Sequence, residues 1–181
     1  IHPKDISEKA QFAIDQYVLG GGKLLVMVDP KSAVELQNQP RQNPMMGGMG
    51  QSQSSDMPKL LEAWGVGYRA DQVVADRRCF TAMPSRSGRG IDNNPLVLSL
   101  REENFDKKDV TTSQLSQMLM YWAGALVDQT SEDITFTPLV SSSDRSGTLD
   151  QMTAQFVGDV ASKELTFDDT RRTIAARLSG T

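Results

Sequence analysis

The chain contains very few of the residues from which catalytic and metal-binding sites are most often built, with one cysteine and one histidine among its 181 residues. A single cysteine excludes a disulfide within the chain and a zinc site made of cysteine thiolates. One histidine removes most metal sites and most Ser-His-Asp arrangements as well. We therefore predict no metal site and no cofactor.

Long hydrophobic stretches and an excess of basic residues are also lacking. No run of about 18 or more apolar residues occurs, so no part of this chain is predicted to span a membrane. The 23 acidic residues outnumber the 19 basic ones, and the resulting net charge of −4 argues against a nucleic-acid-binding surface. Glycine and proline, at 14 and 8 residues, are close to the globular average, which excludes collagen-like and wholly disordered classes.

The first residues, Ile-His-Pro-Lys, include neither an initiating methionine nor the apolar core of a signal peptide. This opening is typical of the interior of a longer protein, and we expect Ile1 to be the last residue of a strand. We therefore expect targeting and anchoring signals to lie outside the chain.

The length allows one domain with a sizeable core, and the first part of the chain predicts a helix–turn–strand unit. The helix covers Asp5–Leu19 with Ser7 as its N-cap, and Gly20-Gly21-Gly22 ends it. The apolar run Lys23–Val28 then shows no alternation, which is typical of a strand covered on both faces in a parallel sheet.

The remaining elements continue this pattern and become richer in strands toward the C-terminus. A second unit consists of a helix over Met57–Trp64 and a strand over Gln72–Ala75. Further strands are predicted over Leu96–Leu100, Met118–Val127, Ile134–Val140 and Arg172–Leu178, with Met118–Val127 also compatible with a helix and Thr148–Val160 either helical or irregular. The predicted fold is a single α/β domain over residues 1–181, a mostly parallel sheet flanked by helices with a β-rich C-terminal part.

Two polar stretches are predicted to be loops. The stretch 38–57 is rich in Gln, Met, Gly and Ser and has no branched aliphatic residue, which indicates a mobile surface loop. Its cluster of Met45, Met46 and Met49 fits either a disordered insertion or an adaptable partner-binding patch. The stretch 83–95, rich in Gly, Ser, Asn and Arg, is the second loop.

Three polar residues follow predicted strands and are candidates for a ligand-binding crevice. His2 follows Ile1, Asp29 follows Val28, and Asp76 follows Ala75. In an open α/β sheet, ligands bind at the carboxyl ends of the strands. Aspartates at strand ends also commonly cap the next helix or turn, which is the alternative role for these residues.

A group of arginines and the single cysteine lie in the region that follows. Arg77, Arg78, Arg86 and Arg89 form either a patch for an anion or an acidic partner, or a solvated basic loop. Cys79 has no histidine in a recognisable pattern around it, so a buried or incidental thiol is predicted rather than a nucleophile. No catalytic residue is predicted.

An ordered series of short stretches covers nearly the whole chain. It consists of His2–Glu8, Ala13–Leu19, Gly21–Val26, Val28–Pro30, Leu60–Val66, Asp71–Asp76, Leu98–Leu100 with Asn104, Ala123–Leu126, Phe136–Leu139 and Ala175–Gly180. In this order the stretches resemble the GldG-type gliding-motility domain, the auxiliary domain of uncharacterised ABC transport systems. The most recognisable positions are His2, Pro3, Asp29, Pro30 and Trp64.

This resemblance implies a subunit that works beside an ABC permease and ATPase on the extracytoplasmic (periplasmic) face of a bacterial inner membrane, tethered by membrane helices outside the chain. It also implies a flavodoxin-like or glutamine-amidotransferase-like layer. The amidotransferase nucleophile and histidine are not matched, so we predict a non-enzymatic binding or coupling domain that engages its transporter or a glycan- or lipid-like cargo. The alternatives are a periplasmic ligand-binding receptor for such a cargo, and a hydrolase or amidotransferase relative that uses His2, Asp29 and Asp76.

Overall fold

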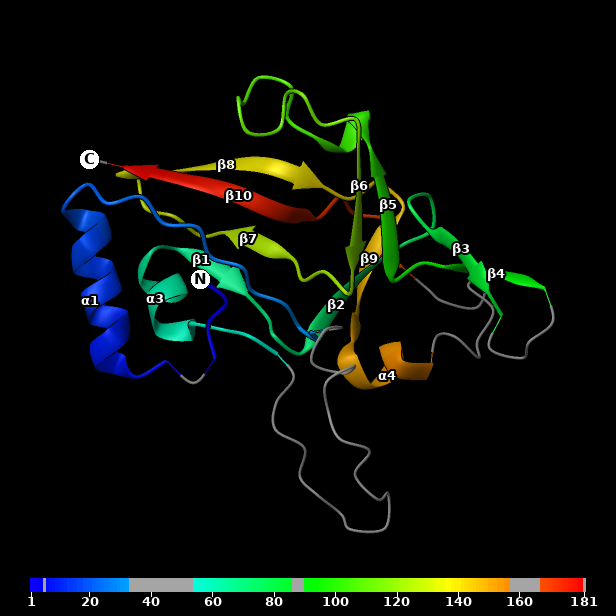
Figure 1. Cartoon of the computed structure of the whole chain (residues 1–181), viewed down its shortest axis with the longest axis horizontal. Coiled ribbons are helices and arrows are strands. Elements are labelled where there is room, and N and C mark those ends of the chain that lie inside the picture. Colours follow the sequence, from blue (N-terminus) through cyan, green and yellow to red (C-terminus); the bar gives the residue numbers. More distant parts are fainter. Residues whose placement is uncertain (5, 33–53, 86–89, 157–166, 181) are drawn as a thin grey trace, which may run out of the picture.

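The protein is built mainly from short antiparallel strands, and its helices α1 (Glu8–Leu19) and α3 (Pro58–Ala63) lie together at one end (Figure 1). The structure is a computed structural model that describes residues 1–4, 6–32, 54–85, 90–156 and 167–180. No helix in these ranges is both long enough and apolar enough to cross a membrane.

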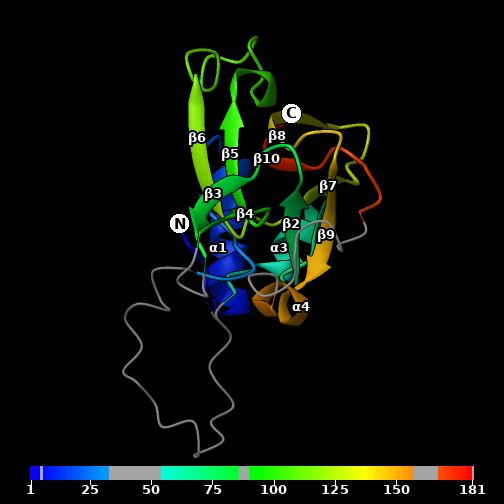
Figure 2. The same cartoon turned by 90° about the vertical axis from the view of Figure 1, so that its right-hand side faces the viewer.

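The largest sheet has four strands in the order β1-β7-β10-β8, and neighbouring strands in it are antiparallel. These strands are β1 (Val66–Tyr68), β7 (Leu126–Asp128), β8 (Ile134–Ser141) and β10 (Thr173–Gly180). Antiparallel two-stranded ladders pair β2 (Gln72–Asp76) with β9 (Ser146–Asp150), β3 (Thr81–Pro84) with β4 (Ile91–Asn94), and β5 (Val97–Arg101) with β6 (Gln117–Tyr121). Figure 2 shows that the β2–β9 and β5–β6 ladders are separate.

The predicted α/β fold, with a mostly parallel sheet of flavodoxin-like or glutamine-amidotransferase-like type, is therefore wrong. The apolar strand β2 is buried on both faces, but helices do not cover both of them. Val74 packs in one core cluster with Leu98 of β5, whereas Val73 packs on the other face with Leu96 and with Ala154 of α4 (Gln151–Phe156). Burial of a strand on both faces does not show whether helices or other strands cover it.

Both predicted N-terminal helices are confirmed, together with the residues that end them. The Ser7 hydroxyl accepts a hydrogen bond from the Ala10 N–H at 3.3 Å and caps α1, and Gly21 follows its end with φ of +87°. Helix α3 is followed by Gly65, whose φ is +72°. The Trp64 Nε1–H donates to Asp15 Oδ1 at 3.0 Å, which ties the end of α3 to α1.

The stretch 23–28 is extended but forms no regular strand. Leu25 and Met27 are exposed, whereas Val26 and Val28 pack against the core cluster beside α3. The run is therefore covered on one face only. Ile1 lies beside it, because its ammonium group donates to Leu25 O at 2.5 Å and its carbonyl accepts from Met27 N–H at 2.8 Å. These two hydrogen bonds flank Val26 as they would in a parallel β-bridge between Ile1 and Val26, but the pairing does not continue beyond this one position.

Other predicted elements differ in their limits. The stretch 118–127 is divided between β6 and β7 by Trp122, whose φ is +51°, and the stretch 148–160 contains the end of β9 and then α4. The predicted loop 83–95 contains β4 and the end of β3, which pair as a ladder.

Most of the predicted loop 38–57, with Met45, Met46 and Met49, lies outside the described residues. At its described end, Ser55 and Met57 are fully buried.

Candidate functional site

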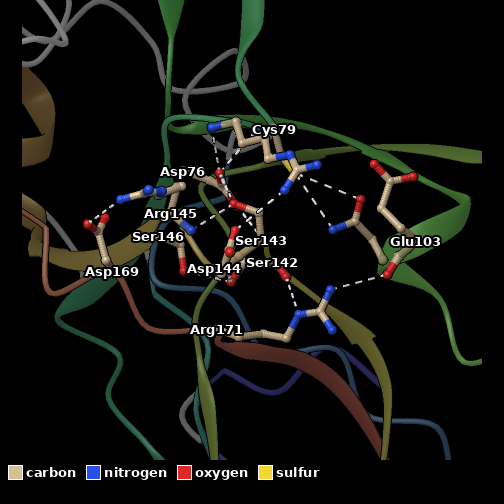
Figure 3. Close-up of polar contacts among 12 residues, drawn as sticks. Asp76, Cys79, Glu103, Ser142, Ser143, Asp144, Arg145, Ser146, Asp169 and Arg171 are labelled. Carbon is tan, nitrogen blue, oxygen red and sulfur yellow. Dashed lines mark hydrogen bonds and ion pairs between the residues drawn. The ribbon is translucent and has the colours of Figure 1, made fainter.

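Polar side chains from distant parts of the sequence meet where β2 ends (Figure 3). They come from the turn after β2 (76–79), the connection between β8 and β9 (142–145), the short helix η1 (Glu102–Asn104), and the segment that leads into β10 (168–172). We call this group the Asp76 cluster. Its core is the carboxylate of Asp76, which is fully buried.

The Asp76 carboxylate accepts hydrogen bonds on both oxygens. Oδ1 accepts from the N–H of Arg78 at 2.8 Å, the N–H of Cys79 at 3.0 Å and the hydroxyl of Ser143 at 2.7 Å, and Oδ2 accepts from the Ser143 N–H at 2.6 Å. Burial by itself would raise the pKa of Asp76, but the hydrogen bonds from Cys79, Ser143 and Arg78 together hold that pKa below its ordinary value. The group is therefore a buried anion that fixes two turns.

Buried serines continue the network toward β10. The hydroxyls of Ser142 and Ser146 lie 2.6 Å apart, and both residues are fully buried. Ser142 Oγ also accepts from the Arg172 N–H at 2.8 Å, while Ser146 Oγ donates to the Thr170 carbonyl at 2.7 Å. These contacts fix the segment before β10 against the β8–β9 connection.

The thiol of Cys79 faces the side chain of Asn104 within this cluster. Its Sγ lies 3.6 Å from Nδ2 and 3.8 Å from Oδ1 of Asn104, and the same amide donates to the Ser141 carbonyl at 2.9 Å. Burial, reinforced by the charge of Asp76, raises the pKa of Cys79 to about 11. The thiol is thus protonated at neutral pH, and the prediction of a buried cysteine is confirmed.

A hollow of about 380 Å³ opens beside the Asp76 cluster, lined by Arg78, Cys79, Glu103, Asn104, Asp144 and Arg171, with Ser143 at its wall. Arg171 Nε donates to the Ser142 carbonyl at 3.0 Å, and its Nη2 donates to the Glu103 carbonyl at 3.3 Å. Arg78 Nη1 lies 3.6 Å from Asp144 Oδ1, and both of these side chains are exposed. The hollow therefore has two guanidinium groups on its wall.

The predicted crevice of His2, Asp29 and Asp76 is divided in the structure. His2 Nε2 lies 3.2 Å from Asp29 Oδ2, and Asp29 also accepts from the Ser55 hydroxyl at 3.2 Å. Asp76 lies elsewhere. Gln151 links Pro30 to the start of β2, since its Nε2 donates to the Pro30 carbonyl at 2.7 Å and its N–H donates to the Asp71 carbonyl. Asp29 therefore lies near the start of β2, whereas Asp76 lies at its end.

Sequence reasoning missed a buried tyrosine beside the His2–Asp29 pair. The Tyr68 hydroxyl is buried and has no hydrogen-bond partner among the described residues. Burial raises its pKa well above the usual value, and the charges of Asp56 and Asp29 add to that effect. Burial likewise raises the pKa of Asp56. A lone tyrosine at the end of a short strand carries no signal of this environment in the sequence.

The predicted arginine patch is also rearranged. The Arg77 guanidinium lies 4.7 Å from the ring centre of Phe167, and Arg78 lines the hollow. Arg86 and Arg89 lie outside the described residues. The residue that joins Arg78 at the hollow is Arg171, which sequence reasoning did not select because it lies more than ninety positions away along the chain.

The potentially reactive groups in these two places are Ser143, Cys79 and His2. The Ser143 hydroxyl is directed to a carboxylate, the Cys79 thiol is protonated, and His2 is paired with Asp29. Among the described residues, no histidine contacts a serine hydroxyl or a thiol, and no group of three acidic, histidine or cysteine side chains could hold a metal ion.

Comparisons with known proteins give one match. A family model described as "ABC-type uncharacterized transport system" matches residues 1–181. No curated protein and no solved structure matches the chain.

Proposed function

The chain belongs to the ABC-type uncharacterized transport system family, and we propose that it serves such a system as a non-enzymatic auxiliary domain that acts by contact. In this proposal its partners are the ABC permease and ATPase, and it works on the extracytoplasmic face of a bacterial inner membrane. In this proposal the domain is of the GldG gliding-motility type, which its sequence resembles.

The observation that carries the non-enzymatic proposal is the way the reactive groups of the Asp76 cluster are used. Asp76 accepts four hydrogen bonds, from the main chain of Arg78, Cys79 and Ser143 and from the Ser143 hydroxyl, which leaves it poorly placed to accept a proton from a substrate. A nucleophilic cysteine needs a lowered pKa, and the pKa of Cys79 is raised instead. Both features support a structural role for the cluster.

The partner proposal is tested with the complete protein that carries this chain, expressed in its native membrane and cross-linked under mild conditions. We expect mass spectrometry of the purified material to identify an ABC permease and an ATPase. An unrelated membrane protein of the same abundance, carried through the same steps, is the control. Recovery of the protein alone would overturn the coupling role.

The non-enzymatic proposal has a separate test. Cys79→Ala and His2→Gln each remove a group that an enzyme would need, and each variant is used to complement a strain that lacks the protein. We expect both to restore whatever defect the deletion causes. Failure of a variant that is folded and present at wild-type level would show that its side chain does chemistry, whatever the partner experiment finds.

A further inference from the structure

We propose that the hollow beside the Asp76 cluster binds a phosphoryl group, held between the guanidinium groups of Arg78 and Arg171. This inference does not depend on the proposed transport partners, since it rests on the lining of the hollow alone.

Arg171 is the principal binding residue in this proposal, because its guanidinium group is held in place but is not neutralised by an ion pair. Two main-chain carbonyls, those of Ser142 and Glu103, hold its Nε and Nη2. No carboxylate among the described residues forms an ion pair with it, and Figure 3 shows the Glu103 carboxylate at the opposite end of that residue from the carbonyl that Arg171 contacts. Nη1 of this guanidinium makes no hydrogen bond to the described residues. An oriented guanidinium loses little entropy when it binds an anion.

Arg78 supplies the second cation, and Asp144 competes for it. The separation of 3.6 Å between Arg78 Nη1 and Asp144 Oδ1 is too long for a hydrogen bond, and both side chains are largely exposed. Such an ion pair is weak, so a ligand with a higher charge can replace the carboxylate. The backbone of Arg78 does not move in this exchange, because its N–H is bound to Asp76.

The two arginines and the size of the hollow favour a phosphate monoester over a simple carboxylate. Arginine binds phosphate through paired N–H donors, and two guanidinium groups match the two negative charges of a monoester once Asp144 is displaced. The Glu103 carboxylate also lines the hollow and opposes binding of an anion. A volume of about 380 Å³ exceeds what a phosphate alone would fill and lies within the range of small-molecule sites. The buried charge of Asp76 opposes binding only weakly, since four donors already compensate it.

The test is a titration of the 181-residue chain with glycerol 3-phosphate, followed by the amide ¹H–¹⁵N signals. We expect shifts confined to the residues around the hollow, above all 78–79, 103–104, 143–144 and 171. Vesicles of phosphatidylcholine with and without phosphatidic acid distinguish the source of the phosphoryl group: co-sedimentation with the acidic vesicles identifies a lipid headgroup, and its absence identifies a soluble ester. Binding to neither probe at about 10 mM phosphoryl group, well above a millimolar Kd, would overturn the proposal.

Substitutions make the test specific. Arg171→Gln should raise the Kd about tenfold or more, because a charge-assisted hydrogen bond to the phosphoryl group is lost. Asp144→Asn should lower the Kd, because it frees Arg78. Arg69→Gln is the matched control, since Arg69 is an exposed arginine paired with Asp71 and should bind as the wild type does.

Unchanged binding in Asp144→Asn counts against the proposal, because this substitution removes the carboxylate that competes for Arg78. If Arg171→Gln fails to fold, Arg78→Gln replaces it, because only the backbone of Arg78, and not its exposed side chain, bonds Asp76.

Discussion

Ser143 donates two hydrogen bonds to the carboxylate of Asp76, one from its N–H to Oδ2 at 2.6 Å and one from its hydroxyl to Oδ1 at 2.7 Å, although the two residues are 67 positions apart. This double contact joins the end of β2 to the connection between β8 and β9. Because Asp76 also accepts from the backbone of Arg78 and Cys79, it fixes the wall of the hollow from both sides.

We predict that Asp76→Asn destabilises the fold by about 2–4 kcal/mol, because an amide cannot accept at both of its terminal atoms and leaves a buried donor unpaired. The measurement is urea unfolding at neutral pH. Asp71→Asn is the control, since it removes an exposed carboxylate that pairs with Arg69 and should change the free energy of unfolding by less than about 1 kcal/mol. Equal effects of the two substitutions would contradict the role assigned to Asp76.

The lowered pKa of Asp76 predicts loss of stability in acid. In the unfolded chain this carboxyl titrates near its ordinary value of 3.8, and in the folded protein it titrates lower. Its contribution is therefore fully present above about pH 4–5 and is lost as the pH falls through the folded pKa. Unfolding free energies measured between about pH 5 and pH 2 should fall less steeply for Asp76→Asn than for the wild type. Parallel curves would show that other carboxylates, such as Asp109 and Asp150, account for the acid sensitivity.

The raised pKa of Cys79 predicts slow modification of its thiol. Its pKa of about 11, against an ordinary value of 9.0, lowers the thiolate fraction at pH 8 about a hundredfold, and burial slows access further. Reaction with a thiol-specific disulfide reagent at pH 8 should be at least that much slower in the folded protein than in urea. Comparable rates under the two conditions would place the thiol at the surface.

Gly65 and Gly21 form a matched pair that separates backbone strain from steric overlap. Both have positive φ, +72° and +87°, so alanine is strained at either position. A Cβ on Gly65 would lie 2.5 Å from Thr130 Cα, whereas a Cβ on Gly21 would meet nothing within 4 Å. We expect Gly21→Ala to cost about 1 kcal/mol of unfolding free energy and Gly65→Ala clearly more. Thermal and urea unfolding of both variants measure the difference, and similar losses would mean that the segment 129–130 can move aside.

The chain's local signals located its elements well. Ser7, the glycines after Leu19, and Gly65 marked helix ends that the structure contains, because caps and positive-φ turns depend on neighbouring residues. The strands predicted over Gln72–Ala75 and Leu96–Leu100 likewise appear as β2 and β5. The prediction of parallel pairing was wrong. A strand that is buried on both faces can be covered by helices, as in a parallel sheet, or by other antiparallel ladders, and its sequence does not distinguish the two.

The candidate site was predicted only in part. Strand-end position selected His2, Asp29 and Asp76, and two of these, His2 and Asp29, do lie 3.2 Å apart. Their separation from Asp76 depends on strand order, which no local pattern specifies. The positions of Arg171 and Ser143 beside Asp76 could not be predicted, because no motif among their neighbours in the sequence indicates a site.

By itself, the sequence determined the positions of α1 and α3 and of strands such as β2, β5, β8 and β10, the lack of a disulfide within the chain, and the family to which the chain belongs. These depend on composition, on neighbouring residues or on order along the chain. Only the tertiary structure decided which strands pair, that they pair antiparallel, and that Arg78 and Arg171 line one hollow beside the Asp76 cluster. Those features arise from contacts between residues far apart in the chain, whose free energy depends on the packing of the whole molecule.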